Sequence, residues 1–149
     1  MLSHSRLLAG VAAPVAMAVA LAGCSDPEPA GPPPGGLTAG TAEVTINGSK
    51  VDTTHSVRCT SEGAVTTINT GDDTAGTTSA VDTSEGAVVQ FAQIRDLGGF
   101  TGGYWADLDP EAEVTASGRT FLMNGTANGF NNSNPSARIS QTFSIRVAC

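Results

Sequence analysis

The chain has 149 residues, enough for one small domain, with 14% charged and 5% aromatic residues. Fourteen acidic side chains outnumber seven lysines and arginines, which gives a formal net charge of −7 at pH 7. Phosphate backbones repel such an acidic chain, so we expect no nucleic-acid partner.

The first 23 residues have the pattern of a lipoprotein signal peptide. Arg6 precedes an apolar run over residues 7–21, and two small residues separate this run from Cys24. A transmembrane helix needs about 20 apolar residues, more than this run provides. Because the peptidase and the lipid transfer require small residues beside an accessible thiol, Leu-Ala-Gly-Cys at 21–24 predicts cleavage before Cys24 and lipidation of its thiol. An ordinary secretory leader and an uncleaved anchor helix are the alternatives.

Lipidation would give Cys24 a diacylglyceryl group and often a third acyl chain, such as palmitate, on its amine. Several acyl chains hold a protein durably at a membrane, since each buried CH₂ contributes about 0.8 kcal/mol. We therefore expect a lipid anchor in the cell membrane, on the extracytoplasmic face, with the protein in the cell envelope. Residues 24–41 are rich in Pro and Gly and have little to bury. They predict a disordered tether, which could reach roughly 40–50 Å as extended polyproline II.

Residues 42–149 predict a single β-rich domain. Short runs of Val, Ile and Thr alternate with turn signals, and the strongest turn is Asn47-Gly48, which predicts a two-residue hairpin. Asp72-Asp73 beside a glycine is a second turn signal. Strands are expected at 44–46, 50–51, 56–59, 65–68, 87–94, 102–108, 113–116 and 120–123. Residues 69–79 are interpreted as a loop, and residues 124–135 as a long connection that holds one short strand at 126–130.

The last segment carries the clearest strand pattern. Its apolar residues share one parity, broken only by Gln141, and its polar residues share the other; the apolar set is Ile139, Phe143, Ile145, Val147 and Cys149. This period of two predicts a half-buried strand. A sustained helical stripe is missing from the sequence, and the best candidate for a helical turn is 135–139. The fold class is therefore all-β with at most one short helix, as a small antiparallel sandwich or a partly closed barrel.

The cysteines predict one disulfide. Once Cys24 is lipidated, Cys59 and Cys149 remain, an even number in an oxidising compartment. Both are expected to point inward, since Cys59 shares a face with Val57 and Cys149 has the parity of the apolar side of the last strand. The link would close a loop of roughly 90 residues, worth about 4–5 kcal/mol in the chain-entropy model. Two free thiols or a metal site are alternatives, although His55, the single histidine after the leader, completes a poor zinc set.

Few other residues suggest chemistry. Carboxylates at every second position from Asp107 to Glu113 could attract Ca²⁺, but their spacing does not fit an EF-hand loop, and we interpret them as a solvated loop. A nucleophile motif does not accompany His55, so we predict no catalytic residue, no metal and no cofactor. Phe100, Tyr104 and Trp105 lie among four glycines. Core packing is the simpler interpretation of these aromatic side chains, and a ligand groove for an acyl chain or a sugar is the alternative.

Four segments resemble the mycobacterial lipoprotein antigen family, the LpqH-like lipoproteins, and occur in the same order. They are Ser-Val-Arg-Cys-Thr at 56–60, Leu-Gly-Gly-Phe-Thr-Gly-Gly-Tyr at 97–104, Asn-Gly-Thr-Ala-Asn-Gly at 124–129 and Phe-Ser-Ile-Arg-Val-Ala-Cys at 143–149. The family pattern also places cysteines at the positions of Cys24, Cys59 and Cys149. The resemblance implies a lipid-anchored envelope protein that is exposed to the host and sensed by innate immunity, and it does not imply a catalytic activity. It does not extend to the tether, where typical members carry Thr- and Ser-rich sequence that accepts O-linked sugar.

The expected function is that of a surface-exposed antigen or adhesin-type interaction module, monomeric and without enzymatic activity. Its first partner is the membrane, through the lipid anchor, and host receptors or envelope glycolipids are further candidate partners. A periplasmic carrier of lipid or glycolipid is the alternative, and it would use the aromatic segment at 100–105.

Overall fold

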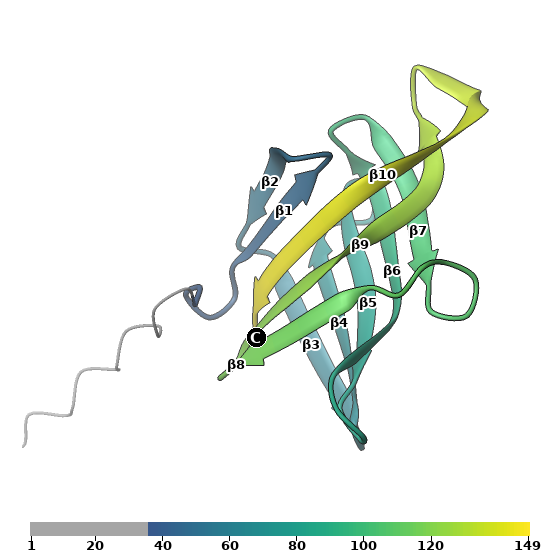
Figure 1. Cartoon of the computed structure of the whole chain (residues 1–149). Coiled ribbons are helices and arrows are strands. Elements are labelled where there is room, and N and C mark those ends of the chain that lie inside the picture. The colour runs from purple at the N-terminus through teal and green to yellow at the C-terminus, as the bar shows by residue number, and fades with distance from the viewer. Residues whose placement is uncertain (1–35) are drawn as a thin grey trace, which may run out of the picture.

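Ten strands and no helix make up residues 36–149, the part of the chain that the computed structural model describes (Figure 1). The strands are β1 (Ala42–Ile46), β2 (Ser49–Thr54), β3 (Val57–Glu62), β4 (Val65–Gly71), β5 (Gly76–Asp82), β6 (Val88–Leu97), β7 (Phe100–Trp105), β8 (Glu113–Ser117), β9 (Thr120–Asn131) and β10 (Asn134–Ala148). The all-β class is confirmed. The helical turn expected at 135–139 is wrong, because these residues belong to β10.

One antiparallel sheet contains all ten strands and curls into a nearly closed barrel (Figure 1). The strand order is β2-β1-β10-β9-β7-β6-β5-β4-β3, and β8 pairs with the first half of β9 while β7 pairs with its second half. The two outermost strands, β2 and β3, are consecutive in the chain and are joined by residues 55–56 alone. This short connection brings both ends of the sheet to one corner.

The disulfide expected from the sequence is present between Cys59 and Cys149. It joins β3, at one end of the sheet, to the residue that follows β10, and it spans 90 residues of sequence with the Cα atoms 5.9 Å apart. Both cysteines pack against the hydrophobic core, so they point inward as their parity indicates.

The last strand also has the predicted alternation. Phe143, Ile145 and Val147 are buried, and the residues between them face outward. Ile145 pairs with Val44 of β1 on one side and with Met123 of β9 on the other, so three neighbouring strands present one apolar wall. Full burial of each large apolar side chain stabilises the fold by about 1.5–3 kcal/mol.

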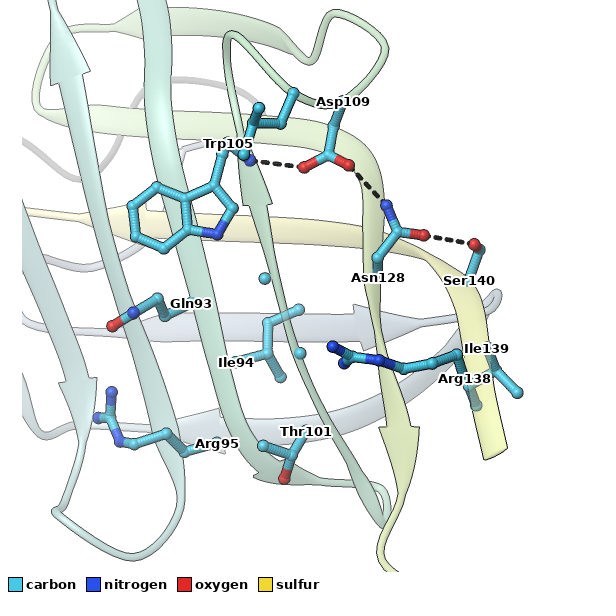
Figure 2. A pocket seen from close by; sticks show the side chains of 13 residues that line it. Gln93, Ile94, Arg95, Thr101, Trp105, Asp109, Asn128, Arg138, Ile139 and Ser140 are labelled. Carbon is cyan, nitrogen blue, oxygen red and sulfur yellow. Dashed lines mark hydrogen bonds between the residues drawn. The ribbon is translucent and has the colours of Figure 1, made fainter. Parts of the chain in front are cut away.

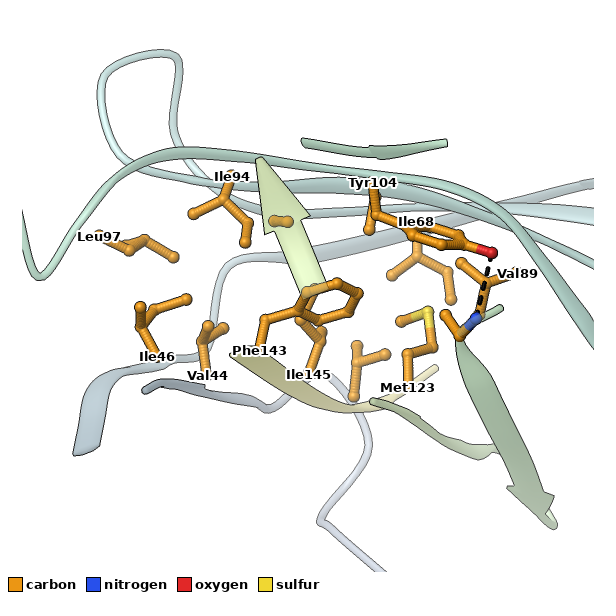
Figure 3. Close-up of a cluster of buried hydrophobic side chains, with 14 of the residues drawn as sticks. Val44, Ile46, Ile68, Val89, Ile94, Leu97, Tyr104, Met123, Phe143 and Ile145 are labelled. Atoms are coloured by element: carbon orange, nitrogen blue, oxygen red, sulfur yellow. Dashed lines mark hydrogen bonds between the residues drawn. The ribbon is translucent and has the colours of Figure 1, made fainter. Parts of the chain in front are cut away.

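The opposite wall comes from β4, β6 and β7 and contributes Ile68, Ile94 and Tyr104 (Figure 3). The rings of Tyr104 and Phe143 meet with their centroids 6.2 Å apart and their planes inclined by 55°. Tilted ring pairs at this distance place a positive ring edge near a negative ring face. The interior between the two walls is therefore filled by side chains.

The hairpin at Asn47-Gly48 is confirmed, because β1 ends at Ile46 and β2 begins at Ser49. Both turn residues have positive φ angles, 49° for Asn47 and 80° for Gly48. Turns of this kind match the right-handed twist of the flanking strands, and Asn-Gly adopts them at little cost.

The loop expected at 69–79 is wrong, because β4 extends to Gly71 and β5 begins at Gly76. The inward positions at the end of β4 and the start of β5 carry hydroxyls rather than apolar groups. Thr70 and Thr77 are buried and share a hydrogen bond of 2.8 Å between their Oγ1 atoms. A buried hydroxyl pair satisfies its own polarity, so a polar sequence here does not mark a loop.

The long connection expected at 124–135 is also wrong, although the short strand expected within it at 126–130 is part of β9. β9 continues to Asn131, and residues 132–133 form the turn into β10. The inward positions Gly125, Ala127 and Gly129 are small, which removes the apolar alternation that would mark a strand. The signal peptide expected at 1–23, Cys24 and most of the tether expected at 24–41 lie outside the described residues.

Candidate functional site

An open groove of about 880 Å³ lies on the face of the sheet that is turned away from the core, over β6, β7, β9 and β10 (Figure 2). We call it the outer groove. Its lining mixes one aromatic ring and aliphatic side chains with amides, hydroxyls and charges, contributed by Gln93, Ile94, Arg95, Thr101, Trp105, Leu108, Asp109, Asn128, Arg138, Ile139 and Ser140.

Strand alternation separates the three aromatic residues proposed from the sequence as a ligand groove. Phe100 and Tyr104 have the inward parity of β7 and are 1% exposed in the core. Trp105 follows Tyr104 and so faces outward, where it lines the outer groove and is 43% exposed. Core packing therefore accounts for two of these rings, and the groove contains the third.

The indole of Trp105 is held in place by a neighbour on β6. Phe91 is its cross-strand partner, and the two rings stack with centroids 5.4 Å apart and an angle of 28° between their planes. Cross-strand aromatic pairs contribute roughly 0.2–1 kcal/mol to a sheet. The pair therefore fixes the orientation of an aromatic surface that remains open to solvent.

Two glycines of β7, Gly102 and Gly103, line the groove. Gly102 and its partner on β9, Gly129, have the inward parity of their strands, and the two backbones approach closely. A Cβ on Gly129 would lie 2.0 Å from the carbonyl oxygen of Thr101, and one on Gly102 would lie 2.7 Å from that of Asn128. Larger residues cannot occupy these positions without moving the backbone. Gly103, next to Gly102, leaves the space below the Trp105 indole unfilled.

A hydrogen-bonded chain forms one wall of the groove (Figure 2). The amide of Asn128 donates from Nδ2 to Asp109, and its Oδ1 accepts from the hydroxyl of Ser140. The second carboxylate oxygen of Asp109 accepts the backbone N–H of Trp105 at 2.7 Å. Three chain segments are therefore coupled through polar side chains, which fixes their positions relative to Trp105.

The loop at 106–112 is attached to β7 from both sides. Inside the barrel, the hydroxyl of Tyr104 accepts the backbone N–H of Ala112 at 3.2 Å (Figure 3). Outside, the carbonyl oxygen of Trp105 accepts the N–H groups of Leu108 and Asp109, both at 3.0 Å. The carboxylate of Asp109 is thereby held at the edge of the groove.

Two arginines line the groove and differ in their bonding. Arg95 donates to the Thr78 hydroxyl at 2.8 Å and to the backbone carbonyl of Asp72 at 3.1 Å, so it holds the β4–β5 turn to β6. Arg138 is exposed and forms no salt bridge within residues 36–149. Figure 2 shows its side chain extending across the groove from β10.

The other candidate residues do not assemble into a site. His55 shares a hydrogen bond of 3.1 Å with the Thr41 hydroxyl and lies between β2 and β3. Within residues 36–149, no three His, Cys, Asp or Glu side chains are grouped so that they could hold a metal ion. That same part of the chain has no helix of the length and apolar character needed to cross a membrane.

Sequence reasoning identified Trp105 as a groove candidate but not the polar residues around it. The sequence predicts Asn128 in a short strand within a long connection, and it indicates Ser140 only as part of the polar face of the last strand. Asp109 was grouped with the solvated acidic run. A usable signal was the repeated glycine at 102–103 and 129, because paired glycines on neighbouring strands allow close backbone approach. Pairing of β7 with β9 cannot be read from sequence spacing.

The sequence model of the Mycobacterium 19 kDa lipoprotein antigen family matches residues 35–149. Two relatives named "Putative lipoprotein" are similar to this chain over 110 residues. The one from Mycobacterium indicus pranii is 36% identical and aligns over 73% of this chain and 78% of the relative. The one from Mycobacterium avium subsp. hominissuis is 37% identical and aligns over 73% of this chain and 76% of the relative. The chain is therefore a lipoprotein associated with the cell envelope, and it belongs to the Mycobacterium 19 kDa lipoprotein antigen family.

Proposed function

We propose that this lipoprotein antigen is anchored through lipid on Cys24 at the extracytoplasmic face of the cell membrane, and that its β-domain acts as a surface-exposed interaction module of the adhesin type. The observation that carries the proposal is the Leu-Ala-Gly-Cys motif at 21–24 in a chain of a lipoprotein family. Several acyl chains on one residue give durable attachment without a membrane-spanning segment.

The point at which the chain enters the domain supports this arrangement. Gly40 donates its backbone N–H to the carbonyl oxygen of Ala148 at 2.8 Å, and the N–H of Leu37 lies 3.4 Å from the Thr120 hydroxyl that accepts it. The anchor side of the domain is therefore the end where β9 begins and β10 finishes. Asn128 of the outer groove lies eight residues further along β9, roughly 26 Å at about 3.3 Å per residue. The groove is thus displaced from the anchored end.

An interaction module is favoured over the alternative of a lipid carrier. A carrier needs an apolar cavity that shields acyl chains from water. Here the interior is occupied by packed side chains such as Tyr104, Phe143 and Met123, and the outer groove is open to solvent and does not enclose a ligand. We also propose a noncatalytic role. His55 forms a hydrogen bond with Thr41 and does not line the outer groove.

The anchor is tested with Cys24→Ala in the full chain expressed in a mycobacterial host. We expect the variant to leave the membrane fraction and to appear in the culture fluid, because the acyl chains have no other attachment point. Protease treatment of intact cells should remove the β-domain of the unmodified protein. Retention of the variant in the membrane fraction would refute anchoring through Cys24, and full protection from protease would refute surface exposure.

The matched control is Cys59→Ala, which also removes one thiol. This substitution breaks the disulfide but leaves the lipidation motif intact. We expect the control protein to remain in the membrane fraction, even where loss of the disulfide lowers its total amount in the cell. Release of both variants would attribute the effect to folding rather than to the anchor.

A further inference from the structure

We propose that the outer groove binds a saccharide, with one sugar ring against the Trp105 indole and with the sugar hydroxyls bonded to the amide, hydroxyl and guanidinium groups around it. This inference goes beyond the proposed function, because binding in the groove does not depend on the lipid anchor. The inference assigns one chemical class of ligand, the saccharides, to the proposed interaction module.

The Trp105 indole is the first reason. Trp105 is 43% exposed, and the stacking of its ring on Phe91 holds it in one orientation. A pyranose ring has one face rich in C–H groups, which packs on an aromatic face, and a rim of hydroxyls. An exposed tryptophan surrounded by polar groups matches both parts of such a ring.

The polar part of the lining is the second reason, because it favours a ligand with hydroxyls over a purely apolar one. A sugar hydroxyl both donates and accepts hydrogen bonds, so a site for it needs donors and acceptors close together. The groove supplies them in the Gln93 amide and the Arg138 guanidinium. An acyl chain would cover these groups without bonding to them, which costs free energy for each unpaired group.

The shape of the groove is the third reason. Gly103 has no side chain to fill the space beside the Trp105 indole, and the groove remains open to solvent. A volume of about 880 Å³ exceeds one monosaccharide, so the groove suits several linked sugar units. The hydrogen bonds of Asp109 to Asn128 and to the Trp105 backbone already order the wall, which limits the ordering cost of binding.

The charge of the groove is consistent with this class of ligand. Arg6 is the only charged side chain before Cys24, so the chain from Cys24 onward has a formal charge of −8. The outer groove departs from this excess of acid, since its lining holds two arginines and one aspartate. Neutral sugars and sugars with acidic substituents can therefore both approach it.

The test uses intrinsic fluorescence, because Trp105 is the only tryptophan of the chain. The full lipidated chain is purified in a zwitterionic detergent, since detergents with sugar headgroups would compete. Maltohexaose, mannohexaose and an oligogalacturonate are titrated in turn, with inorganic phosphate and a free fatty acid as comparison probes. We expect at least one saccharide to give a saturable blue shift as it covers the indole. Absence of saturation with all three, or saturation with phosphate or fatty acid alone, overturns the proposal.

Gly103→Ala links the signal to the groove. A Cβ at this position would lie 3.4 Å from Trp105 Nε1 and from the Ala92 carbonyl oxygen, so it fits the fold but fills space beside the indole. We expect saccharide affinity to fall at least tenfold, and we expect Trp105→Ala to abolish binding measured by calorimetry. Val88→Ala, which truncates another exposed apolar side chain outside the groove, should bind like the unmodified chain. Equal affinity in all four proteins would place binding elsewhere and overturn the proposal.

Discussion

Ser79 places a hydroxyl in the core that has no hydrogen-bond partner within residues 36–149. The neighbouring hydroxyls are paired, because Thr70 Oγ1 lies 2.8 Å from Thr77 Oγ1 and also accepts the backbone N–H of Thr77 at 3.1 Å. An unsatisfied buried hydroxyl destabilises a fold, whereas a satisfied one is close to neutral or favourable. The unpaired hydroxyl of Ser79 therefore destabilises the fold, whereas the paired hydroxyls of Thr70 and Thr77 stabilise it.

Ser79→Ala is expected to raise the free energy of unfolding by about 1 kcal/mol, because it removes a polar atom that forms no bond. Thr70→Val is the matched control, since it also removes one buried hydroxyl but leaves Thr77 without its partner. We expect this control to lower the free energy of unfolding by about 1–3 kcal/mol. Urea unfolding followed by circular dichroism measures both changes, and destabilisation by Ser79→Ala would contradict the prediction.

Asp72 begins the β4–β5 turn and holds it with its carboxylate. Oδ1 accepts the N–H groups of Ala75 at 2.9 Å and of Thr74 at 2.8 Å. These bonds lower the pKa of Asp72 below its ordinary value of 3.8, with the bond from Ala75 as the largest cause and the charge of Arg95 as a smaller one. A carboxyl with a depressed folded-state pKa stabilises the fold above its unfolded-state pKa and loses this contribution as the pH falls through the folded value.

Asp72→Asn tests this pH dependence because it keeps an oxygen acceptor and removes the charge. We expect the variant to be less stable than the unmodified chain at pH 7, and the difference to shrink as the pH falls below about 4. Asp73→Asn makes the same charge change at a side chain without hydrogen bonds to the turn in the described structure, and it serves as the control. Urea unfolding between pH 7 and pH 2 measures the difference, and a constant difference over that range would refute the prediction.

At the scale of the strands, the contact between β7 and β9 depends on glycine. We expect Gly129→Ala to lower the free energy of unfolding by about 2–3 kcal/mol, because its Cβ would lie 2.0 Å from the Thr101 carbonyl oxygen, which cannot move without separating the strands. Gly103→Ala adds the same methyl group with 3.4 Å to its nearest neighbours and should change stability little. Thermal unfolding of the two variants checks this, and similar melting temperatures would contradict it.

The strands predicted correctly from the sequence are those in which apolar residues alternate with polar ones. Phe143, Ile145 and Val147 identify β10, and Asn47-Gly48 identifies the first hairpin. The end of β4, the whole of β5 and part of β9 were missed, because most of their inward positions hold threonine, serine, glycine or alanine, which carry no apolar signal. These segments form strands because they pair with neighbouring strands. Pairing depends on the folded chain and cannot be read from a short stretch of sequence.

The outer groove was missed for a related reason. Trp105 could be singled out, since it is the one tryptophan and lies beside glycines. Its polar neighbours come from segments far apart in sequence, such as Gln93 on β6 and Arg138 on β10, and only the order of strands in the sheet brings them together. Alternation tells which residues face outward, but it does not tell which outward residues become neighbours.

At the scale of the whole molecule, a covalent link closes the barrel. The sheet begins at β2 and ends at β3, and the disulfide from Cys59 of β3 to Cys149 after β10 ties this end to a strand near the other. The chain enters the domain on the same side, because Gly40 bonds to Ala148 and the N–H of Cys149 bonds to the carbonyl oxygen of Arg119. The region where the chain enters the domain is therefore also the cross-linked region.

The double variant Cys59→Ala with Cys149→Ala is expected to lower the free energy of unfolding by about 3–5 kcal/mol, because the disulfide restricts a long loop in the unfolded chain. Since the loop spans 90 residues, most of the barrel lies inside it. Reducing the unmodified protein with dithiothreitol should give the same loss, whereas the reductant should leave the double variant unchanged. Urea unfolding measures all four samples. A loss below about 1 kcal/mol would mean that the paired strands keep the two ends of the sheet together without the cross-link.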